Sequence, residues 1–222
     1  KIGTAYNLSY NPDNGYYEYM DENLIIEYGE SYTLEVTATI EGQELFAKST
    51  TTVPQAGFEI LPAKSVLDSM VYRQRDASGE LTYFEIVFTR SPGTDFYARS
   101  LTALDADTAT FIYENPFGEF DVEDVLDDFL DFKRNWGWIQ DTPLSPGESS
   151  IEIWWWSTWF YGDYQAIVYA GDKNFRDFLM TFNDVQEMDG NFHEPAFHIE
   201  GDGIGVFASA IADTVYFKVL RE

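Results

Sequence analysis

The sequence contains no cysteine and only two histidines, His193 and His198, in 222 residues. Without cysteine there is no disulfide framework, no thiolate metal site and no thiol redox chemistry. Histidine is the side chain most often used for proton transfer near neutral pH. These two shortages exclude several classes of enzyme before any motif is considered.

Positive charge is also scarce. Thirty-nine Asp and Glu residues oppose thirteen Lys and Arg, which gives a formal net charge of −26. A surface this negative repels nucleic acid and anionic lipid headgroups, because both carry dense negative charge. We therefore expect no nucleic-acid partner. A halophilic origin would also explain the charge, since acidic surfaces suit high salt.

Long apolar runs are missing as well. The longest candidate, residues 151–160, contains Glu152 and is shorter than the ~20 residues that a membrane helix needs. There is no signal peptide, and the chain begins at Lys1, so we expect a processed N-terminus. The sequence therefore predicts no membrane-spanning helix.

Aromatic residues are abundant, with fifteen Tyr, eighteen Phe and six Trp, and they favour β structure. In the first part of the chain, Tyr32, Leu34 and Val36 alternate with polar residues. Glu41 and Gly42 then form a turn, and residues 45–53 return as the second strand of a hairpin. Shorter strands are expected at residues 6–10 and 16–20. Short antiparallel strands with frequent turns predict a partial immunoglobulin-like sandwich over residues 1–55.

Pro54, Gly57 and Pro62 mark a domain boundary, and residues 56–222 are predicted to form a larger antiparallel β domain with one or two short helices. The whole chain is therefore predicted to be mainly β. Helical spacing indicates helices within residues 117–131 and after Asp172, a potential N-cap. Strands are expected at residues 66–73, 81–89, 96–105, 108–113, 201–208 and 214–220, with a hairpin of residues 151–160 and 164–170.

The tryptophans are the most suggestive side chains. On the predicted strand at residues 151–160, Trp154 and Trp156 share one face, whereas Trp155 points to the core. A tryptophan pair on an open sheet face can stack on sugar rings or fill a partner's pocket. Trp136 and Trp138 form a second pair around Gly137, and we take these four residues as candidate ligand-binding residues. The alternative, which we favour for the Trp154–Trp156 face, is burial under the helix at residues 175–182.

Carboxylate clusters support two further hypotheses. Seven carboxylates lie within residues 119–131, and hard cations such as Ca²⁺ prefer carboxylate oxygens. A calcium-stabilised structural module is therefore one alternative, although the spacing is not that of an EF-hand and a solvated helix face explains the block. A glycoside hydrolase with a carboxylate pair is the other alternative, because that chemistry needs only two facing acids.

The remaining motifs point to structural roles. Asp105 and Asp107 fit a turn better than a ligand pair. His193, Glu194 and His198 resemble zinc ligands, but Pro195 breaks the helix on which zinc-binding histidines four residues apart would lie. We expect these to be loop histidines beside phenylalanines. We assign no catalytic residue, no metal and no cofactor.

Several short motifs carry a resemblance to a known family. They are Tyr32-Thr33-Leu34-Glu35-Val36, Thr52-Val53-Pro54, Phe192-His193-Glu194-Pro195 and the glycine-bearing segment at residues 199–207. Together they resemble an uncharacterised family of Bacteroidetes envelope lipoproteins, a domain of unknown function. The resemblance implies export, a lipid anchor on an upstream cysteine, and a periplasmic or outer-membrane location beside nutrient-uptake systems. With it we predict a non-enzymatic protein that binds an envelope protein or a glycan.

Overall fold

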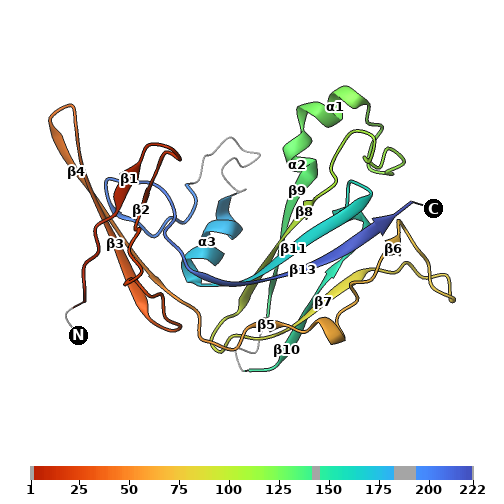
Figure 1. Cartoon of the computed structure of the whole chain (residues 1–222), viewed down its shortest axis with the longest axis horizontal. Coiled ribbons are helices and arrows are strands. Elements are labelled where there is room, and N and C mark those ends of the chain that lie inside the picture. The colour runs from red at the N-terminus through yellow and green to blue at the C-terminus, as the bar shows by residue number, and fades with distance from the viewer. Residues whose placement is uncertain (1–2, 142–145, 183–193, 222) are drawn as a thin grey trace.

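The computed structural model describes residues 3–141, 146–182 and 194–221. Strands account for 42% of the described residues and helices for 13%, in several antiparallel sheets with three short helices. The prediction of a mainly β fold is therefore confirmed. A long hairpin lies at one end of the molecule, and two further sheets lie at the other, with one helix between them (Figure 1).

The N-terminal part consists of two hairpins. Strand β1 (Ser9–Asn11) pairs with β2 (Tyr16–Glu18), and β3 (Ser31–Ile40) pairs with β4 (Gln43–Thr52). The turn residues Glu41 and Gly42 have φ of 53° and 82°, the left-handed values that a tight two-residue hairpin turn requires. This predicted hairpin is confirmed. Its sheet gains a third strand, β12 (Glu200–Gly201), which pairs with β4.

The larger part is a sandwich of two sheets. The first has the order β10–β7–β5 and the second the order β6–β13–β11–β8–β9. All pairs are antiparallel except β6 with β13. The bounds are β5 (Glu59–Ile60), β6 (Met70–Val71), β7 (Phe84–Thr89), β8 (Phe96–Ala103), β9 (Arg134–Gln140), β10 (Glu148–Ile153), β11 (Gly162–Gly171) and β13 (Ala210–Leu220).

The core lies between these two sheets, because in strands such as β7 every second residue is buried on the inner face. Phe84 of β7 packs on Phe217 of β13 with ring centroids 4.2 Å apart, and Phe88 packs on Tyr97 of β8 at 4.7 Å. All four rings are buried. Side chains from the inner faces of both sheets thus fill one continuous core, as in other sandwiches.

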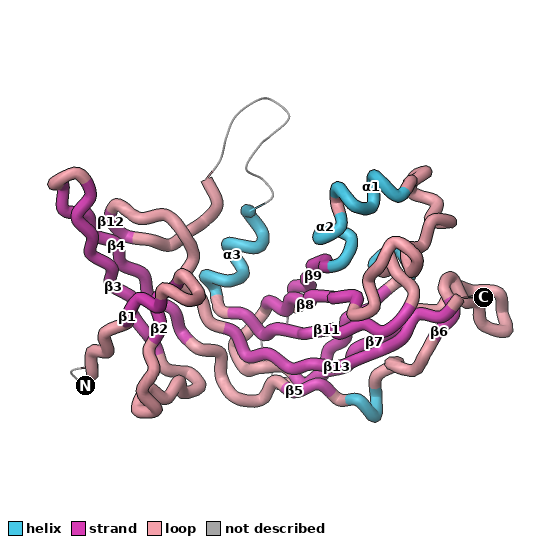
Figure 2. The backbone as a smooth tube through the Cα atoms, turned by 45° about the horizontal axis from the view of Figure 1, so that its top comes forward, coloured by secondary structure: helices cyan, strands magenta, loops and turns pink. Residues whose placement is uncertain are grey.

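In the described part of the chain, three α-helices accompany the sheets: α1 (Val122–Asp127), α2 (Phe129–Lys133) and α3 (Lys173–Thr181). Asp121 and Asp124 form a capping box at the start of α1, and Asp172 caps α3. Both predicted helical regions are confirmed. Helix α3 lies near the β3–β4 hairpin, whereas α1 and α2 lie toward the other end of the five-stranded sheet (Figure 2). No helix in the described part of the chain is long and apolar enough to cross a bilayer.

Some predicted strands are wrong. Residues 151–160 and 164–170 do not pair, because β10 joins β7 whereas β11 lies between β13 and β8 in the other sheet. A 3-10 turn (Trp155–Ser157) carries the chain between the two sheets. Residues 108–113 form only an isolated bridge from Phe111 to Phe160. Of the strand predicted at residues 66–73, only β6 (Met70–Val71) forms. The strand predicted at residues 201–208 is replaced by the two-residue strand β12, which begins one residue earlier. The boundary predicted at residue 55 lies between β4 and β5 and stays a prediction.

Candidate functional site

Trp154 and Trp156 lie just after the end of β10 and stack on each other. Their ring centroids are 5.0 Å apart and their planes differ by 3°. Tyr83 contacts Trp154 at 4.5 Å. The two indoles are thus neighbours, as expected, but the 3-10 turn that follows β10, and not a strand, brings them together.

The Trp154–Trp156 stack is not buried under α3, so the favoured prediction of burial is wrong. Trp156 is 43% exposed. Helix α3 instead packs on the five-stranded sheet, where Phe175 contacts Phe96 and Tyr169. The physical reason is that α3 follows β11, which lies in a different sheet from β10. The chain therefore places this helix over β8 and β11.

Trp155 connects the exposed rings to the core. It packs against the core from its margin, rather than pointing fully into it as predicted. Phe117 stacks on its outer side at 5.5 Å with an interplanar angle of 13°, and the Arg73 guanidinium lies 5.1 Å from its ring centroid, a favourable cation–π geometry. We call Tyr83, Trp154, Trp155, Trp156 and Phe117 the Trp156 cluster.

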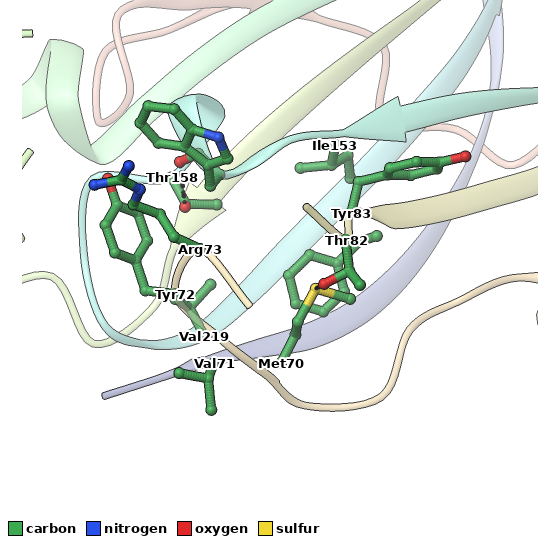
Figure 3. A pocket seen from close by; sticks show the side chains of 11 residues that line it. Met70, Val71, Tyr72, Arg73, Thr82, Tyr83, Ile153, Thr158 and Val219 are labelled. Atoms are coloured by element: carbon green, nitrogen blue, oxygen red, sulfur yellow. Dashed lines mark hydrogen bonds between the residues drawn. The ribbon is translucent and has the colours of Figure 1, made fainter. Parts of the chain in front are cut away.

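A shallow pocket adjoins this cluster. Tyr72 and Arg73 lie on one side of it, and Met70, Thr82 and Tyr83 on the other (Figure 3). Its volume is about 10 Å³, close to the smallest space that holds one water molecule. The pocket therefore suits a single small group and not a whole sugar ring.

Two buried donors line this pocket without a hydrogen-bond partner among the described residues. They are the Tyr72 hydroxyl and Trp155 Nε1. Burial raises the pKa of Tyr72 to about 12, so the hydroxyl keeps its proton at neutral pH and remains a donor. Unpaired buried donors are uncommon in folded proteins. An ordered water or an acceptor group of a ligand would satisfy them.

Trp136 and Trp138 form a separate surface on β9, the edge strand of the five-stranded sheet. They are 43% and 42% exposed. Trp136 stacks on Tyr169 of β11 at 5.4 Å. Between them, a β-carbon at Gly137 would come within 3.1 Å of the Arg99 guanidinium. We call Trp136, Trp138 and Tyr169 the Trp136 cluster.

The four predicted residues therefore fall into two groups, and no ring contact joins these groups in the described part of the structure. The prediction missed Arg73, Phe117 and Tyr169, which come from distant segments and carry no local signal. Tyr83 is different. It precedes Phe84 in an alternating run, so its outward position was readable from the sequence.

The predicted acidic sites have structural roles. Asp121 and Asp124 cap α1, Asp105 Oδ2 accepts a hydrogen bond from Asp163 N at 2.9 Å, and Asp107 Oδ1 accepts one from Ala109 N at 2.8 Å. Among the described residues, no group of three or more His, Asp or Glu side chains is gathered as metal ligands. These carboxylates thus satisfy backbone N–H groups at turns and at a helix start.

A glycosidase acid needs a raised pKa, whereas Asp76 and Asp177, the two described carboxyl groups with a clearly displaced pKa, both have a lowered one. Hydrogen bonds from Ser78 and from nearby backbone lower the pKa of Asp76. Burial raises the pKa of Asp177, but hydrogen bonds from Arg176 and His198 outweigh it and lower the value. His198 Nε2 lies 2.7 Å from Asp177 Oδ2, whereas His193 lies outside the described residues.

No protein-family model matches this chain, and no curated protein matches it either.

Proposed function

We propose that this protein is a non-enzymatic binding protein of the cell envelope and that it binds a glycan through the Trp156 cluster. The observation that carries the proposal is the stack of Trp154 and Trp156, in which a large apolar ring remains 43% exposed. Indole rings combine a flat apolar face with a polar N–H. A ring held in this way by a neighbour is preorganised to receive the apolar face of a sugar.

Polar groups beside these rings suit sugar hydroxyls. Glu152 Oε2 accepts a hydrogen bond from Trp154 Nε1 at 2.8 Å, which fixes the orientation of the indole. Tyr83 lies near the same carboxylate, whose negative charge raises the pKa of the Tyr83 hydroxyl. Arg73 lies at the opposite side of the cluster, over Trp155. Donors and acceptors thus flank an aromatic surface, the combination that gives a ligand site its specificity.

A partner protein is the second candidate ligand for the same cluster. Tryptophan, tyrosine and arginine are the residue types that most often dominate the binding energy of protein interfaces. Arg73, Tyr83 and Trp156 supply all three at one place. The envelope location is supported by the resemblance of residues 32–36 and 199–207 to envelope lipoproteins. A nutrient-uptake system is therefore the setting in which we place either ligand.

A glycan array followed by calorimetric titration of the best soluble oligosaccharide tests the proposal. We expect Trp154→Ala and Trp156→Ala each to weaken binding by about tenfold or more, since each removes a stacking surface worth about 1–3 kcal/mol. Trp136→Ala and Trp138→Ala are matched controls, because they delete indoles as exposed as Trp156 on another surface and should leave the affinity unchanged.

The four variants also separate the alternatives. Loss of binding only in Trp136→Ala and Trp138→Ala would move the site to the Trp136 cluster. Unchanged binding in all four, or an array without any bound glycan, would reject the glycan proposal. Release of a shortened sugar that stops when one carboxylate is neutralised would reject a non-enzymatic role. The envelope location fails if the native protein fractionates away from the periplasm and membranes.

A further inference from the structure

Strand β3 is an unpaired sheet edge. In the sheet order β12–β4–β3, one side of β3 pairs with β4 along ten residues. Within residues 3–141, 146–182 and 194–221, no strand pairs with its other side. Every residue from Glu35 to Ile40 is exposed. The hairpin also projects from the molecule at the end away from the sandwich (Figure 1), so this edge is open to a second chain.

The register shows which backbone groups face outward. Ile40 and Gln43 flank the two-residue turn and therefore form a hydrogen-bonded pair, and such pairs alternate along an antiparallel ladder. The bond from Val53 N to Glu30 O agrees with this phase. Glu35, Thr37 and Thr39 consequently direct their N–H and C=O groups away from β4. These three N–H groups and three C=O groups can therefore pair with a neighbouring strand.

The edge lacks the features that normally prevent strand addition. Exposed edges are usually blocked by proline, a bulge, a short strand or an unpaired charge. Strand β3 has ten residues, no proline and an unbroken register with β4. Its single charged side chain, Glu35, already pairs with Lys48 at 3.0 Å. Nothing on β3 therefore opposes a further strand.

Apolar side chains flank the open backbone groups. Val36 and Ile40 on one face are 48% and 58% exposed, and Phe46, opposite Thr37 on the other face, is also exposed. Cross-strand side-chain pairs are a main source of sheet stability. An added strand would place its own side chains beside Val36 and Ile40. Backbone pairing and side-chain contact would thus occur together.

We propose that β3 is a docking edge that binds a basic, extended segment of a partner protein by β-strand addition. Residues 1–55 carry nine Asp and Glu against two Lys, and the whole chain carries a charge of −26. Lysine or arginine on the incoming strand would be attracted, whereas a second copy of this chain would be repelled. The occupant is therefore a Lys- or Arg-bearing strand and not another molecule of the same protein.

Fluorescence anisotropy with a labelled peptide tests this docking edge. The probe is as long as β3 and alternates Lys with Val, and its control carries Glu in place of Lys. We expect the Lys peptide to bind and the Glu peptide to bind at least about tenfold more weakly. Binding of the Lys peptide should also weaken as salt rises, since salt screens charge attraction.

Two substitutions at Thr37 locate the contact. Thr37→Pro removes an outward N–H without removing a bond of the β3–β4 ladder, and it should weaken peptide binding by about tenfold or more. Thr37→Val keeps the N–H and should bind like the unmodified protein. Circular dichroism and the melting temperature check that both variants are folded. Trp156→Ala should leave peptide binding intact, because the Trp156 cluster is a different surface.

Three outcomes would overturn the proposal. Equal binding to the Thr37→Pro and Thr37→Val proteins would show that the peptide does not pair with β3. If the Lys and Glu peptides bind equally well, or if neither binds, a basic strand is rejected as the occupant. Sedimentation experiments test for a dimer of this chain. A dimer that is lost in the Thr37→Pro variant would assign the edge to a second copy of this chain.

Discussion

Thr51 of β4 donates a hydrogen bond from Oγ1 to Oδ2 of Asp172, the N-cap residue of α3, over 2.6 Å. The other oxygen of Asp172 accepts a hydrogen bond from Phe175 N at 2.9 Å. Asn174 extends this junction by donating to the carbonyl oxygens of Thr50 and Phe207. The Asp172 carboxylate thus caps the start of α3 and also attaches this helix to the β3–β4 hairpin.

We expect Asp172→Ala to destabilise the protein by about 1–2 kcal/mol, because it removes both the helix cap and the bond from Thr51. The free energy of unfolding in urea measures the effect. Asp172→Asn is the matched control and should lose less, since asparagine is also a good N-cap and its amide oxygen still accepts a hydrogen bond. An alanine variant as stable as the original protein would show that this junction contributes nothing.

Two buried tyrosines should respond to loss of their hydroxyl groups with different results. The Tyr72 hydroxyl has no partner among the described residues, so Tyr72→Phe should leave stability unchanged or raise it. The Tyr164 hydroxyl accepts from Trp159 N and Phe160 N and donates to Phe160 O. Tyr164→Phe leaves these groups unpaired and should cost about 1–3 kcal/mol.

Urea unfolding of the two phenylalanine variants provides the comparison, with each serving as the other's control for loss of one oxygen atom. Equal destabilisation of both would show that the Tyr72 hydroxyl is hydrogen-bonded in solution, for instance by an ordered water in the pocket.

Stability should fall at alkaline pH. Burial raises the pKa of both Tyr72 and Tyr97 to about 12, whereas a tyrosine in the unfolded chain ionises near pH 10. The folded state therefore holds more protons than the unfolded state between these values, and the stability present below about pH 10 is lost as pH rises toward 12. Burial lowers the pKa of Arg99 to about 10, which acts in the opposite direction.

Because burial also raises the pKa of Tyr161 and Tyr164, the tyrosines outnumber Arg99 and set the net direction. Unfolding free energies from pH 9 upward, with absorbance at a wavelength that detects tyrosinate, test this. Tyr97→Phe should show a smaller alkaline loss than the original protein. A stability that rises throughout this range would contradict the assignment of these buried hydroxyls.

Added salt should stabilise the protein. At a net charge of −26, the negatively charged side chains of the folded protein repel one another, and salt shortens the range of that repulsion. We expect the melting temperature to rise between low and moderate NaCl in scanning fluorimetry. A non-ionic solute at equal osmolality is the control. A melting temperature that falls with NaCl would show that attractive ion pairs such as Arg90–Asp141 outweigh the general repulsion.

The sequence predicted best where neighbouring residues decide the structure. Alternation at Tyr32, Leu34 and Val36 and the turn at Glu41 and Gly42 were enough to predict the β3–β4 hairpin. The cap at Asp172 and the helical spacing after it likewise predicted α3. Each of these elements closes its hydrogen bonds within about ten to twenty residues, so a local pattern contains the necessary information.

Prediction failed where the deciding contact is distant. The run at residues 151–160 looks like one strand that should pair with the next. In the structure, however, Ile151 of β10 pairs with Ile86 of β7, and the chain turns at Trp155 toward the other sheet. The prediction that α3 buries Trp154 and Trp156 was wrong for the same reason, because α3 follows a strand of a different sheet.

By itself, the sequence determined the mainly β character, the acidic surface, the local hairpin and the start of α3, because propensity, charge and turn chemistry act within a few residues. Only the tertiary structure decided which strands became neighbours, that Glu200 and Gly201 complete the N-terminal sheet, and that Trp156 and the edge of β3 stay exposed. Exposure depends on what packs against a residue from elsewhere in the chain, and no local pattern encodes that partner.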